Sequence, residues 1–156
     1  MNVLDITLVA SYKSVSQKVR VMSEAWVEVN LSCPFCRGEL VSYLANKVGY
    51  DFQCKSCKEN FQLKSFSRKM RGKIIGGEYR KTIEKFQNGM QPNLLVLIYE
   101  PKDWRILNIL LVHRKHLSES LISPRAPLSS SAIRAGWQGC SWILKDIPKH
   151  HWVRLI

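Results

Sequence analysis

Four cysteines in two Cys-x-x-Cys pairs constrain this chain more than any other feature of its sequence. The first pair is Cys33 and Cys36, the second is Cys54 and Cys57, and 17 residues separate them. A two-residue gap lets both sulfurs of a tight turn reach one ion, and two such pairs at this separation are typical of a tetrahedral zinc site. We therefore expect one structural Zn²⁺ on four thiolates. Two unrelated pairs of buried or redox-active thiols are the alternative.

The N-terminal segment MNVLDITLVA has no basic region and no small-residue cleavage site, so we expect no secretory signal. A reducing, cytoplasmic compartment follows, in which disulfides are disfavoured. No apolar run approaches the roughly 20 residues that a membrane span needs. The fifth cysteine, Cys140, stands alone between Gly139 and Ser141, and we expect a small buried residue there rather than a ligand.

Charge indicates the partner. The 156 residues include 24 Lys and Arg against 12 Asp and Glu, a net charge of +12, while 46% of them are hydrophobic. This combination predicts one folded domain that meets a polyanion. Residues 64–85 are the most basic stretch, and Gly72, Gly76 and Gly77 predict a loop at its centre.

Apolar spacing predicts a first helix that begins at an N-cap, Ser16, and ends near Asn30. Its buried stripe would hold four residues: Val19, Met22, Trp26 and Val29. A second helix is expected over residues 78–87, and a short one that closes at Gly136. Strands are expected over residues 94–100, 105–113 and 153–156. The element order predicts a mixed α/β fold with a small sheet.

A hairpin of residues 48–53 and 59–66, with the second cysteine pair at its turn, carries the main functional prediction. If the turn is centred between Ser56 and Cys57, Asp51 lies opposite Gln62 and Phe52 lies opposite Phe61. Because strand residues alternate between faces, one face gathers a carboxylate, an amide and an ammonium: Asp51, Gln62 and Lys64. The other face is apolar, with Tyr50, Phe52, Phe61 and Leu63.

Such a polar face is typical of a metal-dependent nuclease. Mg²⁺ prefers oxygen ligands, which Asp51 offers as a carboxylate, Gln62 as an amide oxygen and Leu63 as a backbone carbonyl. Lys64 is placed to orient or deprotonate the attacking water and to balance charge. A hairpin with a merely solvated polar face is the alternative. His113, His116, His150 and His151 are further candidate bases, but no nucleophile motif accompanies them.

Longer stretches of the sequence resemble the catalytic domain of the DpnI-type, methyl-directed restriction endonucleases of the Dam-replacing family. Besides the four cysteines, the matching motifs run in order through nearly the whole chain: residues 11–20, 24–26, 51–54, 61–65, 77–79, 92–93 and 134–140.

The resemblance implies a PD-(D/E)xK nuclease core, a mixed sheet flanked by helices, as one domain over residues 1–156. A zinc-binding insertion would occupy about residues 31–58. It further implies a type II endonuclease that cleaves double-stranded DNA at adenine-methylated GATC sites. We expect it in the prokaryotic cytoplasm; a monomer is favoured, but the sequence leaves the oligomeric state open. Mg²⁺ would be its catalytic metal, with Mn²⁺ as the substitute.

Two features depart from the family pattern. Gln62 stands where the family has its second acid, and the sequence shows no C-terminal winged-helix domain of the kind that also recognises the methylated site. Two alternatives therefore stay open. The chain is a catalytically weak or inactive DNA-binding module, or it is a nuclease of altered substrate.

Candidate DNA contacts fall in two groups. Lys69, Arg71 and Lys73 would lie along the phosphate backbone. Arg134 and Trp137 lie in a glycine-flanked segment that permits close approach, so we expect Trp137 to contact bases, including the adenine methyl group. A buried core tryptophan is the alternative.

Overall fold

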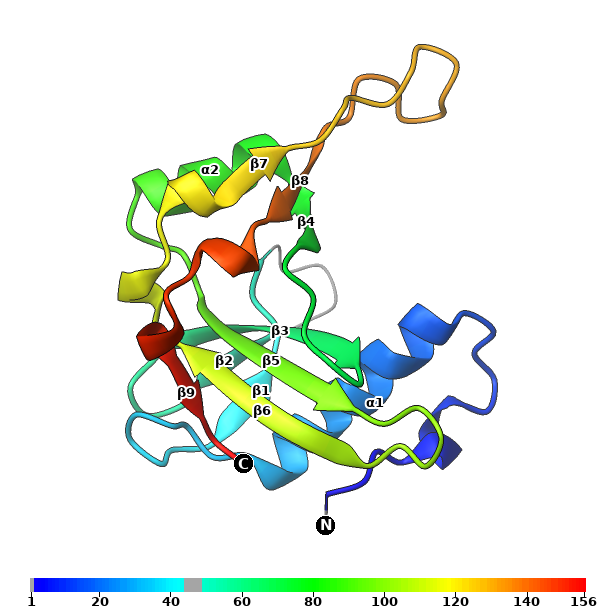
Figure 1. Cartoon of the computed structure of the whole chain (residues 1–156), viewed down its shortest axis with the longest axis vertical. Coiled ribbons are helices and arrows are strands. Elements are labelled where there is room, and N and C mark those ends of the chain that lie inside the picture. Colours follow the sequence, from blue (N-terminus) through cyan, green and yellow to red (C-terminus); the bar gives the residue numbers. More distant parts are fainter. Residues whose placement is uncertain (1, 44–48) are drawn as a thin grey trace. The chain divides into compact units, whose positions relative to one another are not determined.

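The computed structural model describes residues 2–43 and 49–156, which form two compact units (Figure 1). Unit 1 holds residues Met1–Met70, Pro92–Val112 and Val153–Ile156, and unit 2 holds residues Arg71–Gln91 and His113–Trp152. Each unit has its own sheet. Val48, expected in the first strand of the hairpin, lies outside the described residues.

Unit 1 is built on a six-stranded sheet with the strand order β1-β2-β3-β5-β6-β9. Its strands are β1 Leu40–Ser42, β2 Phe52–Cys54, β3 Asn60–Ser67, β5 Asn93–Tyr99, β6 Ile106–Val112 and β9 Trp152–Arg154. β3 and β5 pair in parallel, whereas β1-β2, β2-β3 and β5-β6 pair antiparallel. Every residue of β5 is buried, as expected of a central parallel strand. The predicted mixed α/β class is confirmed.

Helix α1, Val15–Asn30, packs its apolar face on this sheet. The helix starts two residues earlier than the sequence predicts, since Ser14 rather than Ser16 is the N-cap and accepts a hydrogen bond from the backbone N–H of Gln17. Val19, Met22 and Trp26 are buried as predicted, but Val29 is 83% exposed. Val29 lies in the last turn of α1, and the last buried residue of the helix is Val27.

Unit 2 is smaller, with a three-stranded antiparallel sheet in the order β4-β8-β7. The strands are β4 Ile74–Glu78, β8 Gly139–Trp142 and β7 Ile122–Pro124. Helix α2, Tyr79–Gln87, packs on them by placing the ring of Phe86 edge-on against Trp142, 5.6 Å between centroids.

The prediction of a loop at Gly76 and Gly77 is wrong, because both residues belong to β4. Gly76 is needed there for space rather than for flexibility. A Cβ atom on it would lie 2.7 Å from Trp142 Nε1 and 2.8 Å from Cys140 Sγ. Cys140 itself is fully buried, as predicted.

The expected short helix before Gly136 is also wrong. Residues 130–136 form successive turns, and Gly136 adopts a left-handed φ of 81°. Elsewhere residues 2–43 and 49–156 include five short 3₁₀ helices: Ile6–Val9, Arg114–His116, Glu119–Leu121, Leu144–Asp146 and Lys149–His151. None of the helices in the described ranges has the length and apolar character that crossing a bilayer requires.

Ser14 and Ser16 offer a matched test of how α1 begins. Replacement of Ser14 by Ala should destabilise the protein by about 0.5–1 kcal/mol, because the N-cap hydrogen bond is lost. Ser16→Ala should cost less, since Ser16 accepts no helical N–H in the structure. Urea denaturation followed by far-ultraviolet circular dichroism measures both. Equal stability losses would show that Ser14 is not the cap.

Candidate active site

Asp51 is held at the point where β2 begins, beside the middle of β3. Its backbone N–H donates to the carbonyl of Phe61 (2.8 Å), and its carboxylate Oδ2 accepts from the backbone N–H of Leu63 (2.7 Å). These two bonds bracket Gln62. Phe52 pairs with Phe61 and Gln53 with Asn60, so the register predicted from the cysteine turn is confirmed.

Burial raises the pKa of the Asp51 carboxyl, while the Leu63 N–H and the charges of Lys64 and Arg20 act in the opposite direction. The Asp51 carboxylate is thus desolvated, and the Leu63 N–H and the two positive charges offset only part of the cost of its negative charge. A desolvated carboxylate is a strong ligand for a cation, because an added positive charge offsets the cost of removing it from water.

Gln62 and Lys64 project from the same face of β3, two residues apart. Gln62 is only 9% exposed, and its Oε1 is buried with no hydrogen-bond partner in the described part of the chain. A buried amide oxygen without a partner is costly. A hard cation would satisfy it, so the donor set of Asp51 and Gln62 fits a magnesium ion.

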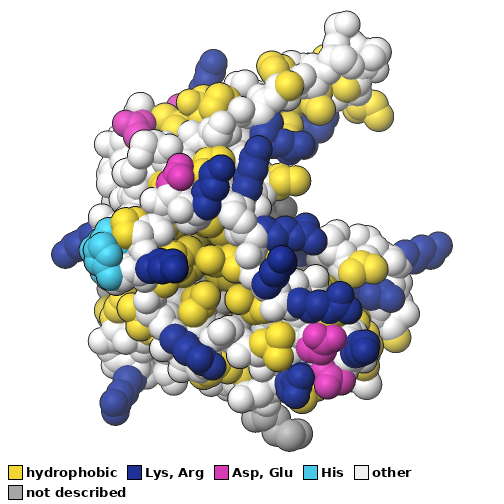
Figure 2. Space-filling model, in the orientation of Figure 1, with side chains coloured by type: hydrophobic (Ala, Val, Ile, Leu, Met, Phe, Trp, Pro, Cys, Tyr) yellow, Lys and Arg dark blue, Asp and Glu magenta, His cyan; other side chains and the backbone are white. Residues whose placement is uncertain are grey.

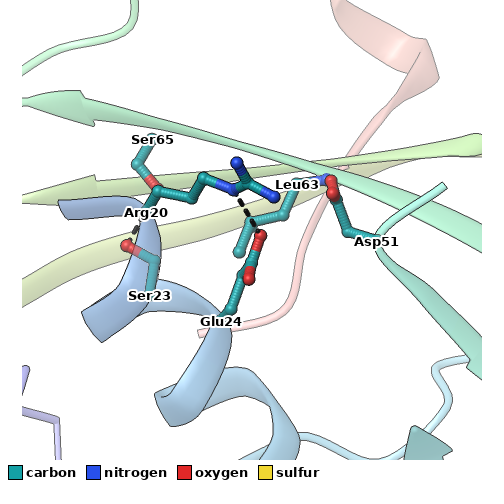
Figure 3. A network of polar contacts seen from close by, with 6 residues as sticks. All are labelled: Arg20, Ser23, Glu24, Asp51, Leu63 and Ser65. Carbon is teal, nitrogen blue, oxygen red and sulfur yellow. Dashed lines mark hydrogen bonds and ion pairs between the residues drawn. The ribbon is translucent and has the colours of Figure 1, made fainter. Parts of the chain in front are cut away.

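The opposite face of β3 carries Leu63 and Ser65 toward α1, where Ser65 Oγ donates to the buried Ser23 Oγ (3.0 Å). Phe52, Phe61 and Leu63 pack in the core on this side, as the sequence predicts. α1 is thereby fixed across β3, and the next residue of the helix, Glu24, faces the region of Asp51 (Figure 3).

Glu24 was not predicted as a site residue. Arg20 Nε donates to its carboxylate (3.1 Å), one helical turn away. Burial raises the pKa of Glu24, the bond and charge of Arg20 oppose that shift, and the negative charge of Asp51 adds to it. Two partly desolvated carboxylates therefore influence each other. The Arg20–Glu24 spacing was visible in the sequence, but nothing in it showed that this part of α1 lies near Asp51.

The second cluster is the four cysteines, whose sulfurs all lie within 4.8 Å of one another. In the described part of the chain no other group of three or more His, Cys, Asp or Glu side chains meets that criterion. The cluster could hold a structural metal such as zinc. Cys33 and Cys54 are buried, whereas Cys36 and Cys57 are exposed.

The two cysteine pairs lie in two separate tight turns that have the same hydrogen-bond pattern. Cys33 N donates to Gly38 O and Arg37 N to Cys33 O, both at 2.8 Å. At the second pair, Cys54 N donates to Glu59 O and Lys58 N to Cys54 O, both at 3.0 Å. In both turns the residue after the second cysteine adopts a left-handed φ of 66°.

The pKa values of Cys54 and Cys57, in the second pair, are shifted in opposite directions. Burial raises the pKa of Cys57 to about 12, with the neighbouring thiols adding to the shift. Burial also opposes ionisation of Cys54, but backbone N–H groups of Cys57 and Ser56 and the Cys36 thiol lower its pKa to about 6. Four thiolates at this separation need a metal to neutralise their charge.

The candidate DNA contacts are divided between the units. Lys69 is exposed in unit 1, and Arg71 and Lys73 are exposed in unit 2. In unit 2, the Arg134 guanidinium lies over the ring of Trp137, 4.9 Å from its centroid. Trp137 is half-buried, so its ring is not enclosed in the core.

The candidate histidine bases all belong to unit 2. His116 and His151 stack at 3.9 Å between ring centroids, and His150 lies edge-on to His151 at 4.3 Å. Stacked rings present faces rather than nitrogens to each other, an arrangement suited to packing rather than to proton transfer.

Comparison with protein families identifies the family of this chain. The sequence model described as "DpnI: Dam-replacing family" matches residues 1–156, the whole chain. The motifs that suggested this resemblance lie at the sites described above: the cysteine turns, the segment around Asp51 and the strand that carries Gln62 and Lys64. The chain belongs to the DpnI, or Dam-replacing, family.

Proposed function

We propose that this protein is a metal-dependent endonuclease that cleaves double-stranded DNA at adenine-methylated GATC sites, with Asp51, Gln62 and Lys64 as its catalytic residues. Membership of the DpnI family indicates a restriction endonuclease, whose partner is DNA. The observation that carries the catalytic assignment is the strand register around Asp51: its carboxylate is fixed on the Leu63 N–H, next in sequence to Gln62, whose buried Oε1 has no hydrogen-bond partner in the described part of the chain.

Asp51, the amide oxygen of Gln62 and the backbone carbonyl of Leu63 would hold Mg²⁺, and the site would be that of a PD-(D/E)xK core. The ion, when bound, polarises the phosphoryl oxygen and acidifies water. Lys64 would orient the attacking water and balance the negative charge that develops on the phosphate. Glu24 supports the assignment, since the charges of two nearby carboxylates oppose each other and a cation would stabilise both.

Gln62 sets the strength of this site. A neutral amide removes one negative charge relative to a carboxylate, and hard cations are held largely by charge. We therefore propose weak metal binding, completed by the anionic phosphate of bound DNA, and slow cleavage that needs high Mg²⁺ or responds better to Mn²⁺. The second candidate, a DNA-binding module without cleavage, rests on the same neutral residue.

The four cysteines would hold one Zn²⁺ with a structural role, because four thiolates close its coordination shell and leave no open position for a reacting group. Bound zinc would stabilise the turns at both ends of the insertion and hence the hairpin that carries Asp51.

Substitutions at Asp51 and Lys64 test the catalytic step separately from DNA binding. Asp51→Asn removes the charged metal ligand and Lys64→Ala removes the group that orients the attacking water, so each should lower the cleavage rate by about 100-fold or more. DNA affinity should stay close to wild type, because both substitutions affect the chemistry. Lys69→Ala is the control. Loss of this exposed, proposed phosphate contact should weaken DNA binding and leave the single-turnover cleavage rate at saturating protein unchanged. Plasmid cleavage and gel-shift titrations measure the two quantities.

Gln62→Glu distinguishes the two candidate functions. In an active enzyme the added carboxylate should lower the Mg²⁺ concentration needed for half-maximal cleavage. If wild type cleaves neither methylated nor unmethylated plasmid with Mg²⁺ or Mn²⁺, while Gln62→Glu does, the natural protein is a DNA-binding module. Absence of cleavage by both proteins under all these conditions would reject the nuclease assignment.

Elemental analysis tests the zinc assignment. We expect one zinc per chain in wild type and none in Cys54→Ser, which should be unstable. Structural zinc contributes about 10–16 kcal/mol, as much as the whole stability of a typical domain, about 5–15 kcal/mol. Cys140→Ala is the matched control, because Cys140 lies outside the cluster and should leave the zinc content unchanged. A folded wild-type protein without metal would contradict the assignment.

Trp137 should contribute to recognition of the methylated site. Trp137→Ala should reduce the ratio of affinities for methylated and unmethylated duplexes by about 10-fold, the effect of roughly 1–3 kcal/mol of base discrimination, and change non-specific affinity less. Trp152→Ala is a control with the same truncation at another half-buried tryptophan. Fluorescence anisotropy with both duplexes measures the ratio. Equal loss of both affinities would assign Trp137 a structural role.

A further inference from the structure

Residues 125–138, here called the arm, connect β7 to β8 in unit 2 and extend beyond both strands (Figure 1). The arm is a hydrogen-bonded ribbon. Arg125 N donates to Gly139 O (3.0 Å), Gln138 Nε2 to Arg125 O (2.8 Å) and Leu128 N to Trp137 O (2.9 Å). Farther out, Gly136 N donates to Leu128 O (3.0 Å). Its two legs are therefore joined along most of their length.

The tip of the arm is compact. Ala132 N donates to Ser129 O (3.0 Å), and the hydroxyls of Ser129 and Ser131 share a hydrogen bond (2.9 Å). This tip presents Ile133, whose side chain is fully exposed, and Leu128 near it is also exposed. An isoleucine in this position contributes nothing to the core of unit 2.

The charge on the arm has one sign. No Asp or Glu occurs between Glu119 and Asp146, whereas the arm carries Arg125 and Arg134. Figure 2 shows hydrophobic side chains along the arm and Lys and Arg side chains near its base. Duplex DNA has anionic phosphates on its outside and stacked, largely apolar bases inside. The positive charges of the arm are complementary to the phosphates, and its apolar tip is complementary to the base stack.

We propose that the arm enters a groove of duplex DNA and that Ile133 acts as a wedge between two stacked base pairs. The inference rests on the proposed function for its partner. Proteins that deform DNA use apolar side chains of this kind, isoleucine included, to part a base step, and proteins that read DNA with β-ribbons place strands in the major or the minor groove.

The neighbouring residues fit this role. Arg134 follows Ile133 directly, and its guanidinium lies over the ring of Trp137, 4.9 Å from the centroid. Insertion of Ile133 would bring this guanidinium to the phosphates or base edges of the same step. The deformation would make binding depend on how easily that step unstacks, and thus add sequence preference at positions that no side chain hydrogen-bonds.

Duplexes with 2-aminopurine at successive positions test the wedge, because this base fluoresces more strongly when its stacking is lost. Measurements without Mg²⁺ or Mn²⁺ keep the DNA intact. Wild type should raise the fluorescence several-fold at one step, and Ile133→Ala should lose most of that rise while still binding. Ile133→Leu should keep it. Ile75→Ala, at a 64% exposed isoleucine of β4 in the same unit, is the matched control and should resemble wild type.

Three outcomes would overturn the inference. One is an equal fluorescence rise for wild type and Ile133→Ala, and another is binding by wild type without a rise at any position. The third is that Ile133→Ala no longer binds anionic vesicles that wild type binds, while its DNA affinity and the 2-aminopurine signal are unchanged. This result would assign the tip to a membrane surface. If wild type binds no duplex at all, the proposed function fails, which anisotropy on the same samples shows directly.

Discussion

The antiparallel pairing of β2 with β3 has to keep one register, because side chains alternate between faces and a slip of one residue would turn Phe52 and Phe61 out of the core. Two features fix it. The cysteine turn closes the hairpin at one end, and the Asp51 carboxylate bonds the Leu63 N–H at the other. The candidate metal cluster and the candidate catalytic residue thus determine the same register, and the core of unit 1 depends on both.

Desolvation dominates the electrostatics around Asp51. Burial raises the pKa of Asp51 and of Glu24, and Arg20 and Lys64 compensate only in part. A third carboxylate at position 62 would add to this burden whenever the cation is absent. In the proposed site, glutamine would provide a metal ligand without that charge, which would lower the metal affinity and also lower the charge repulsion in the metal-free protein. The electrostatic cost of such a site would fall on the metal-free protein, and Gln62 would reduce it.

Sequence patterns predicted what is decided locally. The hairpin register follows from the spacing of two cysteine pairs, and the buried side of α1 follows from helical periodicity. The strand at Leu40–Ser42 was not predicted, because three residues are too few to show alternation. Ser14 and Ser16 are equivalent as sequence signals, so only the structure could select the cap. Gly76 suggested a loop because the requirement for glycine comes from Trp142 and Cys140, which lie more than 60 residues later. The position of Glu24 beside Asp51 depends likewise on how α1 packs across β3.

The chain passes from one unit to the other four times, after Met70, Gln91, Val112 and Trp152. Neither unit is a continuous stretch of sequence, and the sheet of unit 1 gains β9 only after all of unit 2 has been synthesised. No single crossover between two genes could exchange one unit for a foreign version and keep the other whole. The sheet of unit 1 and the arm-bearing sheet of unit 2 are therefore inherited together. If the arm recognises DNA as proposed, a change of recognition would arise by substitutions or short insertions in the arm and not by exchange of a whole unit.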